Sequence, residues 1–470
     1  MARCSSCSDD RSPVHKPGSR RALGAALLAS ALLPLNSTMI AVALPEIARE
    51  FVRPPGAVTQ AVVASYLVAA IVLQSPGGKL GDRVGHWRMM AIGQVLVAAG
   101  AVLGIVAGTL EVLAVARVLM AAGGAAIVPA TVALLRIELP PQRRGRAFGL
   151  FAAVMSLAAG IGPVAGGELV RAFGWPSIFA VNLPLIGLAA LLAAMGRRRE
   201  AQLQDRPRFD VLGTLLLTAT LTALVLGLEA TGTTASVLLG ACAALLVPFV
   251  WWERQVTDPV LTFGLFGSMA FTAGSLLVAL QNLVLYTLLF ELPQVLNAVL
   301  AVDAAATGRL LVAMMAAMIL ASLVAGRLTD RIGARPIAVG GIMCCLAAVG
   351  LLAADDLLSL RPLVLPLALL GLGVGLATPA AQSASLAAVP RDRSGAAAGI
   401  GSTMRYLGGV VGVALLGRLV DLAGDRQAVL VEHRTVLGVF AGALVVGLAC
   451  AVSLPGRSTE RESARAPGGS

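Results

Sequence analysis

The chain of 470 residues is 57% hydrophobic and 13% charged, whereas a soluble globular domain carries roughly 25% charged residues, so a water-soluble protein is excluded. Its net charge of +11 comes almost entirely from arginine, because Lys16 and Lys79 are the only lysines. The arginines cluster in short segments between apolar runs, which favours the positive-inside pattern of a membrane protein over nucleic-acid binding.

Residues 1–21 form a polar segment before the first apolar run. A basic flank before an apolar run could be a signal peptide, but this run continues as a long span without a convincing small-residue cleavage site. We therefore expect a retained cytoplasmic tail. Cys4 and Cys7 have C-x-x-C spacing, but no second pair or histidine cluster follows, so neither a metal site nor a disulfide framework is expected.

Apolar runs long enough to cross a bilayer then follow at nearly regular spacing. A spanning helix needs about 20 predominantly apolar residues, and roughly fourteen such runs are present. We place them at residues 22–43, 57–77, 88–107, 111–135, 146–168, 177–195, 211–229, 236–253, 267–290, 304–325, 337–354, 362–386, 395–417 and 434–454.

Two copies of one short pattern divide this series. Residues 78–85 and 326–333 both read Gly-x-Leu-x-Asp-Arg-x-Gly, each between two apolar runs. Segments this polar belong in loops at a membrane face, and internal repeats of helical hairpins are typical of secondary transporters. The first copy follows span two and the second follows span ten. If spans seven and eight are an inserted pair, each copy follows the second helix of a six-helix half, and we adopt this interpretation.

The predicted organisation therefore has six parts. They are a cytoplasmic tail at 1–21, an N-terminal six-helix half at 22–195, a cytoplasmic loop at 196–210, two additional spans at 211–253, a C-terminal six-helix half at 254–454 and a cytoplasmic tail at 455–470. Most arginines fall on the side of the two repeated loops. This side is expected to be cytoplasmic, with both termini there, in a multi-pass protein of the cell membrane.

Four motifs in this chain resemble those of the major facilitator superfamily, specifically its fourteen-span drug:proton antiporter branch. They are the loop at 78–88, Leu113-x-x-x-Arg117-Val118-Leu119 in span four, Gly149 with Gly162-Pro163-x-x-Gly166-Gly167 in span five, and the first-span segment 35–45. The resemblance covers about residues 22–455. One departure matters most, because Asn36 stands where the first span of this branch usually carries Asp.

The resemblance implies an all-α integral membrane fold and a secondary active transporter. Such a protein exports drug-like or metabolite molecules by alternating access, in exchange for protons; a proton-independent facilitator or an importer of a small metabolite is the alternative. An enzyme is not expected, because the three histidines lie in the predicted tail or loops and no catalytic constellation is visible. The expected partners are a small-molecule substrate and the lipid bilayer, for a monomer that uses no cofactor, no metal and no nucleic acid and draws on the proton gradient.

The repeated loops carry the candidate gating residues. The resemblance implies that the Asp82 carboxylate meets the start of a span from the opposite half, by position near Ser394 and Gly395, where N–H groups and the helix dipole favour an anion. Alternatively, Asp82 only caps a turn and pairs with Arg83. The candidates in the two loops are Gly78, Asp82, Arg83, Gly85, Arg88, Asp330 and Arg331.

Span five combines a helix breaker with small residues. Pro163 removes a backbone hydrogen bond and predicts a kink. Gly162, Gly166 and Gly167 predict the close approach of another backbone, as small-residue faces allow in membranes. Either this is packing alone, or it forms an interface that excludes a leak path.

Arg117 and Glu291 are the candidates for proton coupling. A cation within a span costs roughly 2.5–3.5 kcal/mol on insertion scales, so Arg117 should face a cavity or a partner unless it snorkels to the interface. The resemblance implies a proton-relay role for it beside the first span. Because Asn36 cannot titrate, three accounts stay open: coupling through Glu291 near the outer end of span nine, coupling through a loop carboxylate, or no proton coupling.

Polar and aromatic residues within the spans are candidates for the substrate cavity, which in secondary transporters lies near the midplane between the halves. Each could instead bond a neighbouring helix, although two adjacent amides cannot share one packing partner, which favours Gln281 and Asn282. The candidates are Asn36, Thr38, Tyr66, Gln281, Asn282, Tyr286, Gln382 and Arg405. With few buried anions and 4% aromatic residues, a strongly cationic substrate is disfavoured.

Overall fold

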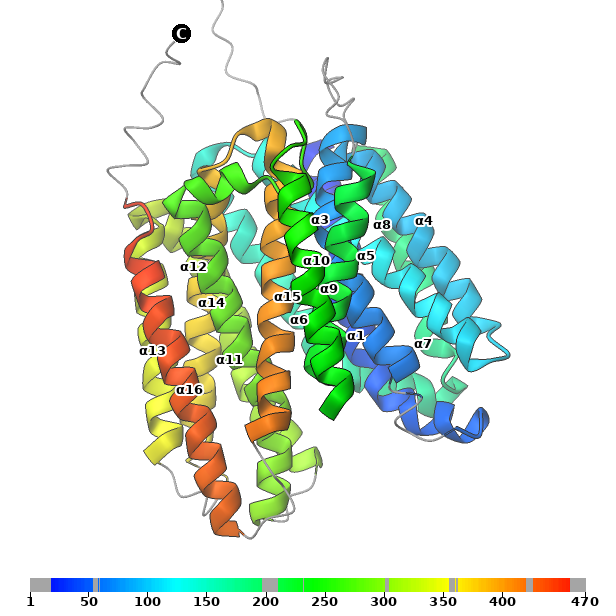
Figure 1. Cartoon of the computed structure of the whole chain (residues 1–470), viewed down its shortest axis with the longest axis vertical. Coiled ribbons are helices and arrows are strands. Elements are labelled where there is room, and N and C mark those ends of the chain that lie inside the picture. Colours follow the sequence, from blue (N-terminus) through cyan, green and yellow to red (C-terminus); the bar gives the residue numbers. More distant parts are fainter. Residues whose placement is uncertain are drawn as a thin grey trace, which may run out of the picture.

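The computed structural model describes residues 18–53, 58, 60–196, 210–230, 232–300, 304–354, 360, 362–419 and 426–456. Most of both predicted tails, most of the polar segment 196–210 and the Cys4–Cys7 pair lie outside these residues. The described residues form helices joined by short connections, with no strand among them. The all-helical prediction is therefore confirmed for the described chain (Figure 1).

The helices follow one another in three groups. The N-terminal half contains α1 (Gly18–Glu50), η1 (Gln60–Ala64), α3 (Ser65–Val84), α4 (His86–Ile105), α5 (Leu110–Glu138), α6 (Pro141–Phe173), α7 (Ser177–Ala180) and α8 (Asn182–Gly196). The additional pair is α9 (Val211–Glu229) and α10 (Gly232–Glu253). The C-terminal half contains η2 (Phe263–Gly267), α11 (Met269–Leu300), α12 (Ala304–Ile332), α13 (Ala334–Ala354), α14 (Val364–Ala387), η3 (Arg391–Arg393), α15 (Ser394–Leu419) and α16 (Arg426–Val452).

Thirteen of the described segments are long and apolar enough to cross a membrane. α15, which is richer in glycine and polar residues, lies outside that set but runs through the same bundle (Figure 1). About fourteen crossings are consistent with this arrangement. α1 and α6 have 33 residues each, or about 50 Å at the helical rise, and so extend beyond a hydrocarbon core of roughly 30 Å.

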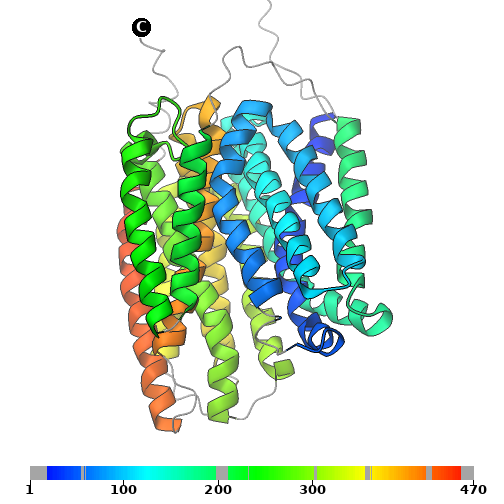
Figure 2. The ribbon, with the colours of Figure 1, turned by 45° about the vertical axis from the view of Figure 1, so that its right-hand side comes forward.

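Each half has its own apolar core, and the halves meet along two helix pairs. One core is built mainly from α1, α3, α5 and α6, the other from α11 to α14 and α16. Between the halves, α3 lies against α15 and α6 lies against α12. The views of Figures 1 and 2 show the resulting two-part bundle, with the blue N-terminal helices beside the yellow-to-red C-terminal helices.

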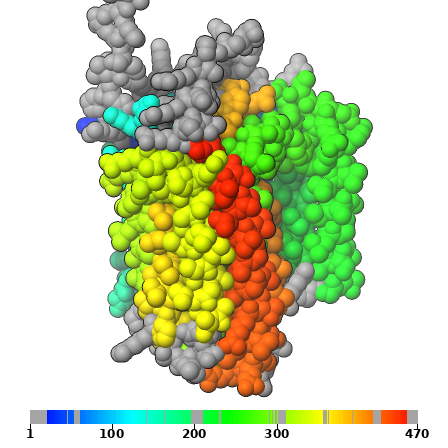
Figure 3. Space-filling view, turned by 90° about the vertical axis from the view of Figure 1, so that its left-hand side faces the viewer, coloured from blue at the N-terminus to red at the C-terminus, as the bar shows by residue number. Residues whose placement is uncertain are grey.

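The additional pair covers one edge of the contact between the halves. Ile71 of α3, Leu221 of α9 and Phe249 of α10 share a buried apolar cluster, against which Tyr406 of α15 packs. α9 and α10 therefore cover the α3–α15 contact (Figure 1). On another face, α13 and α16 form the outer surface of the C-terminal half (Figure 3).

The two repeated segments are helical, which corrects their prediction as loops. α3 continues to Val84 and α12 to Ile332, so most of each segment is the last part of a helix. Only the final glycine of each copy makes the turn, with φ of 97° at Gly85 and 93° at Gly333. This left-handed region favours glycine, because a Cβ there clashes with the backbone.

Candidate functional site

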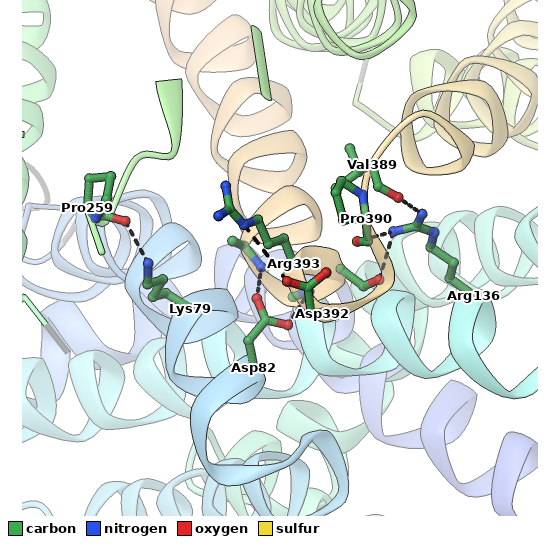
Figure 4. A network of polar contacts seen from close by, with 11 residues as sticks. Lys79, Asp82, Arg136, Pro259, Val389, Pro390, Asp392 and Arg393 are labelled. Carbon is green, nitrogen blue, oxygen red and sulfur yellow. Dashed lines mark hydrogen bonds and ion pairs between the residues drawn. The ribbon is translucent and has the colours of Figure 1, made fainter. Parts of the chain in front are cut away.

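The carboxylate of Asp82 joins the two halves at the face that carries the repeated segments. Its two oxygens accept hydrogen bonds from the backbone N–H groups of Gly395 and Ala396, each at 2.7 Å (Figure 4). These residues begin α15, so the anion lies at the positive end of the helix dipole. The contact predicted near Gly395 is present. Among the described residues Asp82 pairs with His86 at 3.5 Å and forms no ion pair with Arg83.

Asp330 makes the corresponding contact from the second repeat. Its Oδ1 accepts from the N–H of Gly145 at 2.8 Å and its Oδ2 accepts from the N–H of Arg146 at 2.9 Å, both in α6. Each repeat therefore holds a helix of the opposite half by one carboxylate, and we call the two contacts the aspartate clamps. The neighbouring Arg331 is exposed, as is Arg88 beside the first clamp.

Glycines bring the helix backbones together beside each clamp. A Cβ added to Gly78 would lie closer than 3.0 Å to the carbonyl oxygen of Gly395. A Cβ added to Gly326 would likewise lie closer than 3.0 Å to the carbonyl oxygen of Gly145. Real Cβ atoms essentially never approach other atoms so closely. Both α3–α15 and α6–α12 are therefore closed at this face by direct backbone contact, as small-residue helix pairs are in membranes.

A buried arginine adds to the first clamp. Arg136, 3% exposed near the end of α5, donates to the Pro390 carbonyl at 3.1 Å, to the Ser394 hydroxyl at 2.7 Å and to the Val389 carbonyl (Figure 4). It thereby fixes the segment that leads into α15. Arg136 directly follows the predicted span 111–135, and its bonds across the halves were not predicted.

Lys79 connects the first repeat to the linker after the additional pair. Its Nζ donates to the carbonyl of Pro259 at 2.8 Å. The same linker is held by the buried Glu253, whose carboxylate accepts from the N–H groups of Val260 at 3.1 Å and Leu261 at 3.0 Å. The additional helices α9 and α10 are thus attached to the face of the molecule that carries the aspartate clamps.

Arg117 lies inside the N-terminal half, with only neutral groups around it. Its Nε donates to the Val62 carbonyl at 2.9 Å and its Nη1 to the backbone oxygen of Asn36 at 3.3 Å. Its guanidinium lies 4.0 Å from the centre of the Tyr66 ring, and the Tyr66 hydroxyl donates to Leu33 at 2.9 Å. Arg117 is 2% exposed, so snorkelling to the interface is wrong and the predicted place beside the first span is confirmed.

Arg405 lies at a small cavity within the C-terminal half, between α11, α14 and α15. The cavity of about 20 Å³ holds roughly one water molecule. Gln382 and Ser385 also line it. Arg405 forms no hydrogen bond or ion pair with a described residue, and its buried Nε has no partner. Tyr286 and Tyr406 lie within electrostatic reach of its charge.

Glu291 is paired with a histidine that was predicted to lie outside the spans. Glu291 Oε1 and His433 Nδ1 lie 2.8 Å apart, and the two side chains are 0% and 1% exposed. The second oxygen of Glu291 and the second ring nitrogen of His433 have no hydrogen-bond partner among the described residues. His433 belongs to α16, which corrects its prediction as a loop residue; His86 likewise begins α4.

The two amides preferred for the substrate cavity have other contacts. Gln281 Oε1 accepts from the Thr378 hydroxyl at 3.1 Å inside the C-terminal half, and Asn282 donates to the Val278 carbonyl of its own helix at 2.7 Å. Gln281 Nε2 is also buried without a hydrogen-bond partner among the described residues, and the role of the two amides at the substrate cavity stays a prediction. The hydropathy pattern could not predict which way these two side chains face, because an apolar helix in lipid has no clear polar side.

The glycines of span five pack within the N-terminal half. A Cβ on Gly162 would meet the Thr38 hydroxyl of α1, and one on Gly166 would lie 3.1 Å from the Met39 carbonyl oxygen. Gly167 has no heavy atom within 4 Å of the corresponding position, so the predicted close approach there is wrong. α6 is helical through Pro163, whose side chain lies outside the described atoms.

A sequence signal for the clamp partners was available. Gly145 and Gly149 in α6, and Gly395 and Gly399 in α15, each repeat at a spacing of four, which is the small-residue pattern of closely packed membrane helices. The pattern recurs at equivalent positions of the two halves. It identifies helices that can approach a partner, although it does not name the partner.

Comparison with known proteins gives one family. Residues 26–290 and 275–469 match the Major Facilitator Superfamily. The chain is 32% identical over 407 residues to the multidrug resistance protein Stp of Mycobacterium tuberculosis (strain H37Rv), covering 85% of this chain and 75% of that protein. It is 30% identical over 412 residues to the tetracenomycin C resistance and export protein of Streptomyces glaucescens, covering 84% and 76%.

A solved structure shares the same fold. The proton:xylose symporter XylE matches with a TM-score of 0.65 at 15% identity, over 92% of this chain and 94% of that chain. A similarity at this level of identity shows the arrangement of helices and nothing about substrate or direction.

Proposed function

Because this chain belongs to the major facilitator superfamily, we propose that it exports drug-like or metabolite small molecules by alternating access, in exchange for protons. The observation that carries the proposal is the pair of aspartate clamps, which join the two halves at one face. Such contacts can break and re-form as the halves rock about a site between them. The names of the two relatives, for resistance and export, support the outward direction.

We place the clamped face in the cytoplasm, with both termini on that side of the plasma membrane. The arginine-rich segments at this face support that orientation. In the described state the cytoplasmic side is closed, so the site is shielded from the compartment in which an export substrate binds. The chain works as a monomer, without catalysis of a chemical reaction and without a nucleic-acid partner.

We assign proton coupling to Glu291 together with His433. A carboxyl group and an imidazole can each accept and release a proton. They are buried on adjacent helices, α11 and α16, and the described residues provide no third hydrogen-bond partner for them. Glu432 and Arg434 flank His433 along α16. Because the two side chains are in hydrogen-bond contact at 2.8 Å, protons are gained and lost by the pair and not by either residue alone.

The test is transport into everted membrane vesicles with a panel of lipophilic dyes and antibiotics. An imposed pH gradient, acid inside, should drive accumulation, and an ionophore that collapses the gradient should abolish it. We expect Glu291→Gln and His433→Asn each to lower gradient-driven accumulation by about tenfold or more, because either change removes one partner of a buried charged pair.

The matched control is Glu168→Gln, because Glu168 is exposed and, among the described residues, pairs only with Arg171 of the same helix. It should transport like the wild type at equal membrane abundance. Accumulation that is indifferent to the gradient would instead favour the proton-independent facilitator. Accumulation that proceeds only in right-side-out vesicles would favour the importer.

A further inference from the structure

The spanning helices contain cations that no described carboxylate neutralises. Arg117 and Arg405 both lie within spanning helices, and neither forms an ion pair among the described residues. An intramembrane cation is costly and is usually paired with an acidic group or directed to a substrate pathway. Arg117 is satisfied in part by neutral groups, whereas Arg405 has no hydrogen bond at all to a described residue.

Arg405 stands at the depth where a substrate would bind. It is the twelfth residue of α15, about 16 Å from the clamped end and so near the middle of a hydrocarbon core of roughly 30 Å. Gln382 and Ser385 share its cavity, and the Gln382 side-chain oxygen is buried without a partner. The Arg405 donors thus have no acceptor among the described residues, and a ligand with acceptor oxygens would satisfy them.

Two tyrosines lie near this charge. Tyr406 directly follows Arg405 along α15, and the Tyr286 ring packs against Gly409 of the same helix. Phe271 lines the Arg405 cavity itself. Together these residues offer aromatic faces for an apolar ligand body, and the tyrosines add hydroxyl groups for its polar end.

We propose that the ligand of this site is an organic anion, whose acidic group binds Arg405 and whose apolar or aromatic body lies beside Phe271, Tyr286 and Tyr406. A guanidinium binds carboxylate and sulfonate groups through two parallel hydrogen bonds, which gives both affinity and orientation. A cationic ligand in the same place would face Arg405 without a counter-ion, and like charges in a low-dielectric site repel strongly. The inference rests on the proposed export function and names its substrate class.

The cavity in the described state is too small for such a ligand. The Phe271 and Leu386 side chains, together with Ala397 and Ala398, close it at the clamped side. These residues belong to the same half as Arg405, and Leu386, Ala397 and Ala398 also pack into the core of the other half. Separation of the clamped face would therefore remove cover from Arg405 and admit the ligand from the cytoplasm.

The experiment compares two dyes that share a three-ring xanthene body and differ in charge. Carboxyfluorescein is an organic anion and rhodamine 123 a cation. Binding is measured by fluorescence anisotropy with the purified full chain in nanodiscs, and transport is measured in everted vesicles. We expect carboxyfluorescein to bind the wild type, and its affinity to fall about tenfold or more in Arg405→Gln, because a charge-assisted contact is lost. Arg405→Lys should retain part of the affinity.

Arg171→Gln is the matched control, since Arg171 is exposed on α6. It should bind carboxyfluorescein like the wild type. Equal affinity of Arg405→Gln and Arg171→Gln, or binding of rhodamine 123 but not carboxyfluorescein by the wild type, would overturn the inference. Carboxyfluorescein binding that depends on Arg405 without transport of any compound would leave the anion site standing and refute the export function.

Discussion

Arg117 shows how far residue types alone could identify a site. The sequence predicted that this cation faces a partner beside the first span, and the structure places it there. The partners, however, are a tyrosine ring and two carbonyl oxygens. One carbonyl belongs to Val62 in the π-helical turn η1, and turns of this type occur often at functional sites. No residue pattern predicts which backbone oxygen becomes available, because that depends on local helix geometry.

At the same scale, Asp82→Asn tests the first clamp. The change keeps the size of the side chain, but the amide has only one acceptor oxygen. Of the two charge-assisted hydrogen bonds, worth roughly 1.5–3 kcal/mol each, one becomes a weaker neutral bond and the other is lost, because the amide NH2 group faces a backbone N–H. We expect the clamped state to be about tenfold less populated relative to the open one, and transport to fall accordingly. The measurement is the transport rate in everted vesicles at equal membrane abundance.

Asp392→Asn is the control for that variant, because Asp392 lies at the same face but is exposed. Its transport rate should match that of the wild type. If Asp82→Asn also transported at the wild-type rate, the clamp would have no role in gating.

At the scale of elements, hydropathy located the helices but not their ends. Polar residues 78–84 and 326–332 were predicted as loops, yet they continue α3 and α12. Hydropathy reports where a helix leaves the hydrocarbon, whereas the helix itself continues until a residue such as Gly85 allows the turn. The clamps depend on this difference, because only a helical segment presents Gly78 and Asp82, one turn apart, to the same neighbour.

Gly78→Ala is the element-scale prediction. The new methyl group would overlap the backbone of Gly395, so α3 and α15 would have to move apart. We expect reduced transport with normal insertion, because the clamped state is lost while each half keeps its core. Gly340→Ala provides the comparison, since nothing lies within 4 Å of its Cβ position. Equal transport by the two alanine variants would show that backbone contact at Gly78 is dispensable.

At the scale of the whole molecule, the repeat predicted two equivalent units, and the two aspartate clamps show the same kind of contact in each. The sequence could not give the pairing of α3 with α15 and of α6 with α12. It also could not separate Gln281, buried inside one half, from Arg405 at the cavity. Both depend on how each apolar helix is rotated about its own axis. The sequence of a helix in lipid contains few polar residues that would indicate this rotation.

The two clamps should act together on one equilibrium. In a cysteine-free background, Ser385→Cys places a thiol in the cavity, where a membrane-impermeant maleimide reaches it only when the clamped face opens. We expect faster labelling in everted vesicles with either Asp82→Asn or Asp330→Asn, and the fastest with both, because each clamp stabilises the same closed state. Labelling that is unchanged in the double variant would contradict a shared gate.

The unneutralised arginines give the carrier an electrical property. As access to the interface alternates, fixed positive charge shifts relative to the field across the bilayer, and one elementary charge moved through 100 mV corresponds to about 2.3 kcal/mol. With an anion bound, that charge is cancelled, so the loaded carrier would turn outward with little opposition from an inside-negative potential. The carrier without its anion, positive and with a proton bound, would be drawn back inward. The membrane voltage itself would then power each return stroke, and every completed cycle would appear as a current.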